Sequence, residues 1–419
     1  MENMIIKEED FENKYEELLD IRKGVLNRWN EIHPLLLKGG LTTYGSDLDK
    51  ILFDSHVDLL KAEKNHLIGR QLFPGEMAAS IPFDVPSFLT VQYTGSAFLA
   101  GMPVTLHFAK GVREVGEIWE EVLEDKDIKG FKIDDKLSGK EFGNKSIINT
   151  AIRHFTLAGG LPLVDFYKKA DMRYLDTLTV FGPTRPKTLF LSDITNYDGL
   201  LEDRVTCAVH TSMFDSGQLC ALDKELIPVE ENYDLVKDIA IEQVKKIKDM
   251  ASTTHYVAPI TDKSNFQHAV TQLDRFKKNT EKYKILVGGK VNHSQQYIQP
   301  TLIEAKGVDN DIDGFWPYLI INKGAKTDND AVKKATDDTI HGGYAFVNVV
   351  EPNHFYKIEK RLLGGHFSTV LKNANILNHS IGQPYGGFKD SFILRRRNLN
   401  GEIDNLKGNH YSAHIITRG

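Results

Sequence analysis

The sequence predicts an α/β protein with at least two lobes, and three observations support this fold class. The chain has 419 residues, more than one compact core usually holds, so two or three domains are expected. Apolar runs of strand length alternate with amphipathic helical stretches from about residue 73 to residue 372. A composition of 41% hydrophobic and 26% charged residues is that of an ordinary globular protein.

The first part of the chain is predicted to be helical and then to change to mixed structure. Residues 8–37 and 47–68 have helical spacing of apolar residues, separated by the break GGLTTYG. From residue 73, the sequence indicates a strand, a proline-bounded turn, a helix ending at Gly101 and a second strand. Such a β-α-β unit usually belongs to a parallel sheet.

The alternation continues toward the C-terminus. Further helices are expected at about 115–124, 161–173 and 231–250, the last strongly amphipathic. TLTVFGPTRPKTLFLSD reads as two short strands around a proline-rich bend, and the closing HYSAHIIT alternates like a strand.

Charge and cysteine content exclude several function classes. A net charge of -6 gives no electrostatic reason for nucleic acid or an anionic membrane as partner, and RRR at 395–397 is interpreted as a solvated face. Two cysteines cannot form a disulfide framework, and no Cys/His cluster has zinc-ligand spacing. The acidic N-terminus lacks a signal-peptide core, and no apolar run approaches 18 residues. We therefore expect a reduced, cytoplasmic protein.

The stretch FDSGQLC places Cys220 directly after Gly-Gln-Leu. Two interpretations follow from the residues alone. Cys220 is either a buried small hydrophobe or a nucleophile on a turn whose backbone amides point at the group it attacks.

Several stretches occur in the same order as the motifs of one known family. They are IPFDVPSF after Pro74-Gly75, AFLAGMPVTLHFAK, FDSGQLC, APITDKSNF, ILVGGK, YIQPTLIEA, GFWPYLII and QPYGGFKDS. Together they resemble the aldehyde dehydrogenase superfamily from about Pro74 to Lys389. Each motif is weak alone, and their shared order carries the resemblance.

The resemblance implies a fold and a domain order. It implies a Rossmann-type dinucleotide-binding domain with the N-terminal helices at 1–190, an α/β catalytic domain carrying Cys220 at 191–385, and a return segment with an oligomerisation strand at 386–419. A homodimer or homotetramer is expected by the same resemblance.

The resemblance also implies a chemistry. In this family a cysteine thiolate attacks a carbonyl, an asparagine side chain and the cysteine's own N–H hold the oxyanion, and hydride passes to NAD(P). Cys220 fits the nucleophile, and Cys207 is expected in the core. Asp84 stands at the asparagine position, where an ionised carboxylate about 4 Å from an oxyanion would cost about 4 kcal/mol. Asp84 would serve only if protonated; alternatively it caps the following turn.

The family's water-activating glutamate has no counterpart. Its Glu-Leu-Gly-Gly block is here Val180, Phe181, Gly182 and Pro183, and Val180 cannot accept a proton. The absence argues against hydrolytic oxidation and favours exchange of the acyl group with coenzyme A, or reduction of an acyl thioester.

The resemblance places the cofactor-binding residues as well. The adenosine-ribose lysine and glutamate fall at His107 and Lys110, and a lysine in place of the glutamate favours a 2′-phosphate, hence NADP over NAD. The other positions implied are the pyrophosphate turn with Thr156, Gly159 and Gly160, the glycine Gly182, and Asp313 for the nicotinamide ribose.

Two hypotheses remain from the sequence. The first is an oxidoreductase that acts through a Cys220 thioester on an aldehyde or acyl thioester with NADP or NAD. The alternative is a family member without redox activity and without a nicotinamide cofactor, acting as a scaffold or as a cysteine-dependent acyl transferase. The altered positions Asp84, His107, Lys110 and Val180 support the alternative.

Overall fold

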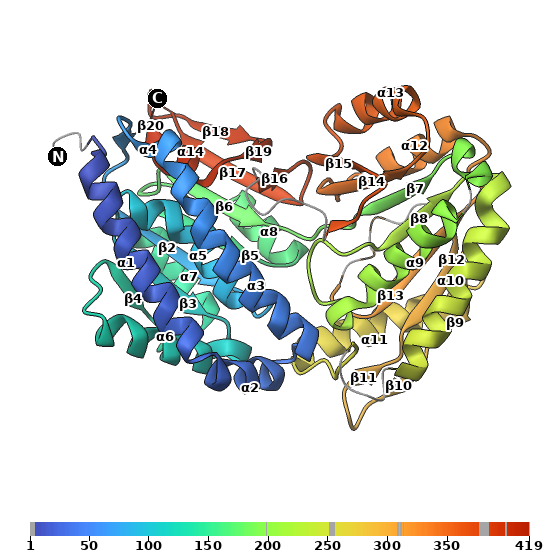
Figure 1. The fold of residues 1–419 in the computed structure, drawn as a ribbon, viewed down its shortest axis with the longest axis horizontal. Helices are drawn as coiled ribbons and strands as arrows, with labels where there is room; N and C mark the ends of the chain where they lie inside the picture. The colour runs from blue at the N-terminus through green and yellow to red at the C-terminus, as the bar shows by residue number, and fades with distance from the viewer. Residues whose placement is uncertain are drawn as a thin grey trace.

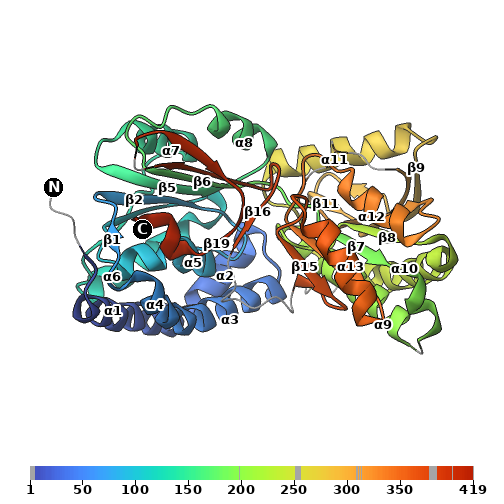
Figure 2. The same ribbon diagram turned by 90° about the horizontal axis from the view of Figure 1, so that it is seen from above.

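A computed structural model describes residues 5–197, 199–250, 256–307, 310, 312, 314–376, 385–398 and 400–418. Two seven-stranded sheets lie side by side, each covered by helices on both faces (Figure 1). Seen from above, the N-terminal segment and the C-terminal segment belong to the same lobe (Figure 2). The α/β fold class predicted from the sequence is confirmed.

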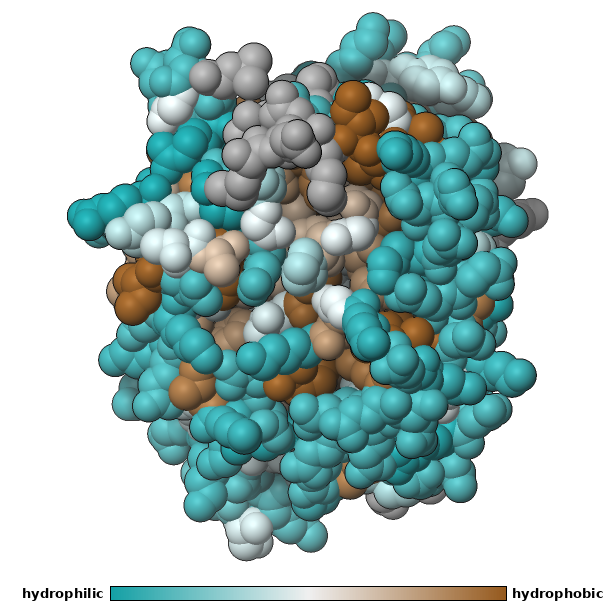
Figure 3. Space-filling model, turned by 90° about the vertical axis from the view of Figure 1, so that its left-hand side faces the viewer, coloured by the Kyte–Doolittle hydropathy of each residue, from teal (hydrophilic) through white to brown (hydrophobic). Residues whose placement is uncertain are grey.

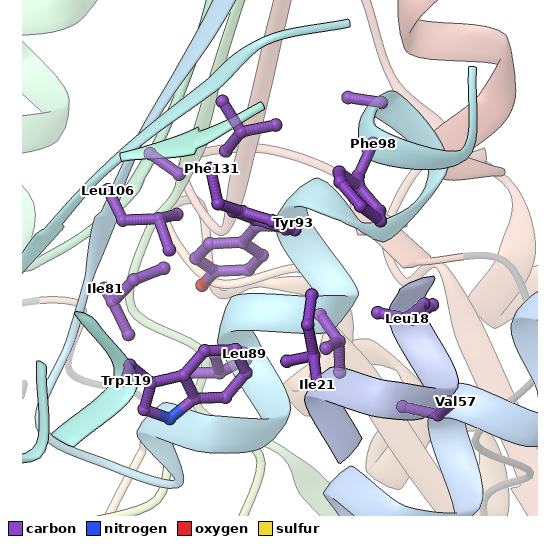
Figure 4. Packing of buried hydrophobic residues seen from close by; sticks show 14 of the residues in the cluster. Leu18, Ile21, Val57, Ile81, Leu89, Tyr93, Phe98, Leu106, Trp119 and Phe131 are labelled. Carbon is purple, nitrogen blue, oxygen red and sulfur yellow. The ribbon is translucent and has the colours of Figure 1, made fainter. Parts of the chain in front are cut away.

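The N-terminal helices follow the predicted spacing. They are α1 (Glu8–Asn27), α2 (Trp29–Gly39), α3 (Thr43–Leu60) and the short α4 (Lys64–Leu67). Leu18 and Ile21 of α1 and Val57 of α3 are buried against α5 (Pro86–Leu99) (Figure 4). Their outer faces contribute to an end of the molecule covered mainly by hydrophilic side chains (Figure 3).

The first sheet has the order β18-β17-β6-β5-β2-β3-β4. Its parallel strands are β2 (Glu76–Ile81), β3 (Val104–Phe108), β4 (Phe131–Ile133), β5 (Ile152–Ala158) and β6 (Thr177–Phe181). Strands β17 (Phe392–Arg397) and β18 (Ile403–Leu406) add to it antiparallel. The predicted β-α-β unit is β2, α5 and β3.

Helices cover both faces of this sheet. Helix α5 and α6 (Arg113–Asp125) pack on one face, and α7 (Gly139–Ile148) and α8 (Leu161–Lys168) pack on the other. Strand order reverses between β2 and β5, since the chain runs from β2 outward to β4 and returns through β5 to β6. Open α/β sheets bind ligands at such a switch point, beyond the carboxyl ends of the strands.

The second sheet has the order β15-β14-β7-β8-β13-β12-β9, parallel except at β9. Helices α9 (Leu200–Met213) and α10 (Glu230–Met250) share one hydrophobic cluster with it, α11 (Lys263–Lys278) a second, and α12 (Asp328–Thr336) and α13 (Pro352–Leu363) a third. The strands of this sheet are β7 (Lys187–Phe190), β8 (Glu225–Pro228), β9 (Tyr283–Val287), β12 (Thr301–Lys306), β13 (Tyr318–Lys323), β14 (Tyr344–Asn348) and β15 (Thr369–Lys372).

The two strands expected around the proline-rich bend are present, but they belong to different sheets. Strand β6 lies in the first sheet, and β7 pairs with β8 and β14 in the second. The chain therefore crosses between the lobes before Lys187 rather than after residue 190.

The C-terminal segment differs from its prediction. Residues Ser412–Ile416 form the short helix α14, because Ala413 and Ile416, three positions apart, are both buried, and the helix packs on α5. The flanking strands β19 (Gly408–His410) and β20 (Thr417–Arg418) pair with β16 (Tyr385–Gly387) and β1 (Gln71–Leu72) of the same chain. The expectation of one extended C-terminal strand is wrong for these residues.

The basic run at 395–397 is not a solvated face. Arg395 donates to the carbonyl oxygens of Tyr167 and Ala170, and Arg396 donates to those of His414 and Thr417. These half-buried arginines tie β17 to its surroundings. Over the part of the chain that the structure describes, no helix is long and apolar enough to cross a membrane.

Candidate active site

Cys220 follows a turn with unusual backbone geometry. Asp215, Ser216 and Gly217 have φ values of 48°, 58° and 68°, so three successive residues adopt the left-handed conformation. A side chain on Gly217 would collide with the carbonyl oxygen of Trp316, which explains the glycine. Cys220 itself is half-buried and packs against a small cluster of buried apolar side chains that includes Ala221.

The N-terminal segment holds this turn in place. Asp215, which is fully buried, accepts hydrogen bonds from the backbone amide of Thr42 (2.6 Å) and from its hydroxyl (2.9 Å). Gln218 donates to the carbonyl oxygen of Gly40 at 2.9 Å. The predicted break GGLTTYG is therefore the segment against which the turn before Cys220 packs.

Asp84 lies between β2 and α5. The next residue, Val85, has φ 45° and ψ 55°, a left-handed conformation that is rare for a β-branched residue and strained. Helix α5 begins directly after it, and its first amides, those of Ser87 (3.2 Å) and Phe88 (2.8 Å), donate to the buried carboxylate of Asp49.

Burial favours the protonated acid form of Asp84 at neutral pH. It is 5% exposed, and burial raises its pKa to about 8. Asp215 and Asp49 act in the same direction, and burial raises their own pKa values to about 6 and about 7. The electrostatic objection to an aspartate at the oxyanion position is thereby removed, because a carboxylic acid donates a hydrogen bond.

Tyr93 lies within electrostatic range of both Asp84 and Cys220. Burial raises the pKa of Tyr93 well above its usual range, and the negative charges that Asp84 and Cys220 would carry raise it further, so its phenol stays neutral. Tyr93 lies between α5 and the strands of the sheet (Figure 4) and stacks on Phe181 with ring centroids 5.0 Å apart. Sequence reasoning missed Tyr93, because α5 carries several other polar residues among which Tyr93 does not stand out.

Val180 is not at the site. Its side chain belongs to the hydrophobic cluster under α7 and α8, on the far face of the first sheet. The residue of this strand that faces α5 is Phe181, which contacts Tyr93 and Phe392. Neither side chain accepts a proton. This position therefore lacks a water-activating base whether Val180 or Phe181 is aligned with the family's glutamate.

The second cysteine has a different environment. Asn375 donates to the sulfur of Cys207 at 2.6 Å, and burial raises the pKa of the Cys207 thiol. A thiol with a raised pKa is a poor nucleophile. No group of three His, Cys, Asp or Glu side chains suited to a metal ion occurs among the described residues.

The expected pyrophosphate turn lies at the switch point, at the carboxyl end of β5. Gly159 is packed so closely that an added Cβ would lie 3.0 Å from the side chain of Leu163. Gly160 precedes α8, and Pro162 in the first turn removes one amide from the anion-binding end of the helix. Thr156 is not at this edge, because it points to the α5 face and lines a small cavity there.

Two other expected cofactor residues have distinct positions. His107 is 2% exposed, its Nδ1 lies 2.9 Å from the carbonyl oxygen of Asp134, and its ring stacks on Phe142. The prediction that His107 binds a ribose is therefore wrong, because its ring is packed inside the lobe. Lys110 is exposed just beyond the carboxyl end of β3.

Gly182 and Asp313 were also expected at the cofactor site. Position 182 requires a glycine because the backbone at Asp390 passes close to it: a Cβ at Gly182 would collide with the carbonyl oxygen of Asp390. Asp313 lies outside the described residues. Gly159 and Gly160 thus lie at the switch point and Lys110 is exposed beyond β3, whereas His107 is packed inside the lobe.

Comparison with known proteins decides the family. Residues 58–405 match the family described as the aldehyde dehydrogenase family. The chain belongs to this family. The match covers most of the chain but begins after Thr42 and Asp49, so residues outside the matched region of this aldehyde dehydrogenase family member hold the turn before Cys220 and the start of α5.

Solved structures share the fold of this aldehyde dehydrogenase family member. An aldehyde dehydrogenase from Pseudomonas syringae, in complex with NAD+ and octanal, has a TM-score of 0.81 at 18% identity, over 98% of this chain and 84% of that chain. A glyceraldehyde-3-phosphate dehydrogenase from Methanocaldococcus jannaschii, in complex with NADP, has a TM-score of 0.78 at 16% identity, over 97% and 88%. At these identities the likeness concerns the fold.

The alignments with curated relatives cover only part of the length of those relatives. A 1-pyrroline-5-carboxylate dehydrogenase from a Geobacillus species is 23% identical over 332 residues, which is 74% of this chain and 60% of the relative. One from Bacillus cytotoxicus is 24% identical over 325 residues with the same coverage. The aligned part thus spans less than two thirds of these relatives.

Proposed function

We propose that this chain is an NAD(P)-linked oxidoreductase that acts through Cys220 on a small aldehyde or acyl thioester and passes the acyl group to a thiol rather than to water. The proposal is carried by the position of the buried Asp84, whose acid form is favoured by burial, and by Tyr93, which lies within electrostatic range of both Asp84 and Cys220. Membership of the aldehyde dehydrogenase family supports it.

The first step is addition of the Cys220 thiolate to the carbonyl carbon. The sulfur–carbon bond forms, the carbon–oxygen π bond breaks, and the developing oxyanion accepts hydrogen bonds from the acid form of Asp84 and the backbone N–H of Cys220. Asp84 takes the place of an amide donor because its burial keeps it protonated. A bound nicotinamide dinucleotide supplies the hydride acceptor or donor.

The second step is release of the acyl group from Cys220. Phe181 and Val180 offer no proton acceptor in β6, so activation of water at this position is lost. A thiol such as coenzyme A needs no such base, because its thiolate attacks the thioester carbonyl directly and Cys220 leaves as the thiolate. The proposal therefore favours acyl transfer to a thiol, or the reverse reduction of an acyl thioester.

NADP is the cofactor that we favour over NAD. Lys110 places an exposed positive charge at the edge where a 2′-phosphate would lie. The homodimer or homotetramer that the family resemblance implies stays a proposal, although the last residues pair within their own chain.

A second candidate is a cysteine-dependent acyl transferase that needs no nicotinamide. The burial of His107 and the proline in the first turn of α8 favour it, because both weaken the expected dinucleotide contacts. The same Cys220 and Asp84 would serve this reaction.

Titration with NADPH and NADH, followed by quenching of tryptophan fluorescence, tests the proposal. We expect saturable binding of both, tighter for NADPH, and a preference reversed in K110E. The matched control is K126E, which makes the same charge change at an exposed position after α6. C220A should bind as the wild type does. Absence of binding by either dinucleotide, with Cys220 still acylated, would establish the transferase instead.

A further inference from the structure

Lys224 is a buried lysine that follows Cys220 closely in the sequence. It directly precedes β8 and is 4% exposed. The backbone amide of Ile320 donates to the carbonyl oxygen of Lys224 at 3.0 Å, and the amide of Lys224 donates to the carbonyl oxygen of Pro186 at 3.4 Å. The backbone of Lys224 is therefore held from both sides at the edge of the second sheet, so its side chain starts from a fixed point.

The side-chain nitrogen of Lys224 lies among three backbone carbonyl oxygens. Nζ donates to Gly217 at 3.1 Å, to Trp316 at 3.2 Å and to Ser212 at 3.5 Å. It also lies 4.7 Å from the centre of the Tyr318 ring, within cation–π distance. Ser212 is in the last turn of α9, where carbonyl oxygens have no partner within the helix. One side chain thus joins the end of α9, the left-handed turn and the segment before β13.

The burial of this nitrogen indicates that its contacts are needed. An apolar side chain of similar length would pack in the same place without the cost of burying a charge. The neighbouring Asp223 is engaged elsewhere, since it accepts a hydrogen bond from the hydroxyl of Thr188. Burial lowers the pKa of Lys224 to about 7. Below this pH Nζ has three N–H donors for three oxygens, and above it the amine keeps two for the shorter contacts with Gly217 and Trp316.

The contact between Lys224 and Gly217 closes a short loop that contains Cys220. This loop comprises residues 217–224. At one end, Gly217 approaches so closely that an added Cβ would lie 2.8 Å from Nζ of Lys224. At the other end, the backbone of Lys224 is fixed at the second sheet. The half-buried Cys220 lies between these two points, so a single residue anchors both ends of the stretch that carries it.

We propose that Lys224 is a positioning residue for Cys220, which fixes the loop 217–224 so that the sulfur and the backbone N–H of Cys220 meet the same carbonyl group. The inference rests on the proposed function, in which this N–H holds the oxyanion. Lys224 acts through the carbonyl oxygen of Gly217 and not by contact with the substrate.

Two reactions of Cys220 separate its position from its exposure. In acetylation by p-nitrophenyl acetate, the sulfur–carbon bond forms through an oxyanion and p-nitrophenolate leaves. In alkylation by iodoacetamide, the sulfur displaces iodide and no oxyanion develops. The thiolate fraction and the access to the sulfur affect both rates. The ratio of the acetylation rate to the alkylation rate, measured by peptide mapping at pH 6, therefore reports the positioning of Cys220.

Three variants of Lys224 test the role of its nitrogen. K224M keeps the length of the side chain and removes the donors, so we expect the ratio to fall about tenfold or more. K224R keeps the positive charge and the N–H donors and should retain most of the ratio, whereas a role in packing alone would favour methionine over arginine. K224Q, whose amide reaches one bond less far, should lower the ratio as well and replaces K224M if that variant does not fold.

The matched control is K187M, which removes another buried lysine at the start of β7. Nζ of Lys187 donates to Glu225 at 2.6 Å and to Asp338 at 2.7 Å. In K187M, Arg185 still pairs with Glu225 at 3.0 Å. His341 still lies 2.9 Å from Asp338. We expect K187M to lower the melting temperature and to keep the wild-type ratio.

The outcomes distinguish this inference from the proposed function. If K224M keeps the wild-type ratio, or if K224R loses it as K224M does at an unchanged melting temperature, Lys224 does not position Cys220 and the proposed function stands. If K187M lowers the ratio as much as K224M, the loss reflects stability and the inference fails. If wild-type Cys220 is alkylated but not acetylated, the proposed function fails and the inference with it.

Discussion

Asp215 and Thr42 are 173 positions apart, yet the backbone amide and the hydroxyl of Thr42 both donate to the carboxyl of Asp215. This contact fixes the left-handed turn that precedes Cys220 to the start of α3. The N-terminal helices are therefore part of the framework of the site and not an appendage to it.

Thr42→Val should weaken this framework while keeping the side-chain shape. Loss of the hydroxyl leaves Asp215 with one donor and removes the cap on the amide of Gly45, so we expect a loss of about 1–3 kcal/mol in unfolding free energy. Acylation of Cys220 should slow as well. Urea unfolding and acylation kinetics measure both, with T271V on the exposed face of α11 as control. Unchanged acylation would contradict the role of Thr42.

The pKa of Asp84, raised to about 8, predicts a limit on activity at high pH. As pH rises through about 8, Asp84 ionises and loses the proton that it donates, so acylation of Cys220 should fall. In D84N the amide donor does not titrate, and the fall should disappear while activity is kept. D84A should be slow at every pH, by about 100-fold. A pH profile of D84N identical to that of the wild type would show that Asp84 is not the titrating donor.

The free energy of unfolding should also depend on the ionisation of Asp84, and it should fall as pH rises. An unfolded aspartate has a pKa near 3.9, so between about pH 4 and pH 8 the unfolded chain releases a proton that folded Asp84 retains. Folding then becomes less favourable as pH rises. From pH 5 to pH 8, D84N should gain on the order of 2–4 kcal/mol relative to the wild type, measured by urea unfolding.

The control for this comparison is D274N at an exposed position of α11. Its stability relative to the wild type should be nearly the same at both pH values. An equal, pH-independent difference for D84N would mean that Asp84 is ionised in the folded protein.

Phe181→Glu should restore a base for hydrolysis, because Phe181 faces α5 and Tyr93. We expect loss of the acyl group from Cys220 to water to accelerate about 100-fold. Val180→Glu is the matched variant one residue earlier; it places a charge in the core under α8 and should destabilise the fold without accelerating hydrolysis. Time courses of acyl-enzyme mass report both rates. Faster hydrolysis in V180E alone would reverse the assignment of the two faces.

Local signals in the sequence were sufficient for part of this description. The unit β2, α5 and β3 followed from apolar runs bounded by Pro86 and Gly101, and Gly-Gln-Leu identified Cys220 as the residue to examine. The possibility that Asp84 is protonated followed from its position in the motif. Its burial, and hence its pKa, did not, because the groups that enclose it come from α3 and from the turn at Asp215.

The errors have physical causes. In β6 a shift of one residue exchanges the two faces of a sheet, so motif alignment alone could not tell Val180 from Phe181. His107 sits at a family position, but the stacking of Phe142 on its ring comes from a helix 35 residues later in the chain. In the C-terminal HYSAHIIT, the apolar residues fit both a strand-like alternation and a three-residue helical spacing. The helix forms because it lets Ala413 and Ile416 both pack on α5.

Acetylation of the purified chain by p-nitrophenyl acetate tests the central claim most directly, since it needs neither the natural substrate nor a cofactor. Intact mass and peptide mapping would follow the acetyl group, with C220A and C207A as paired variants. The account predicts one acetyl group per chain, on Cys220, present in C207A, absent in C220A, slow to hydrolyse and rapidly removed by coenzyme A. Acetylation of Cys207 instead, or continuous fast release of p-nitrophenolate in water without accumulation on Cys220, would contradict it.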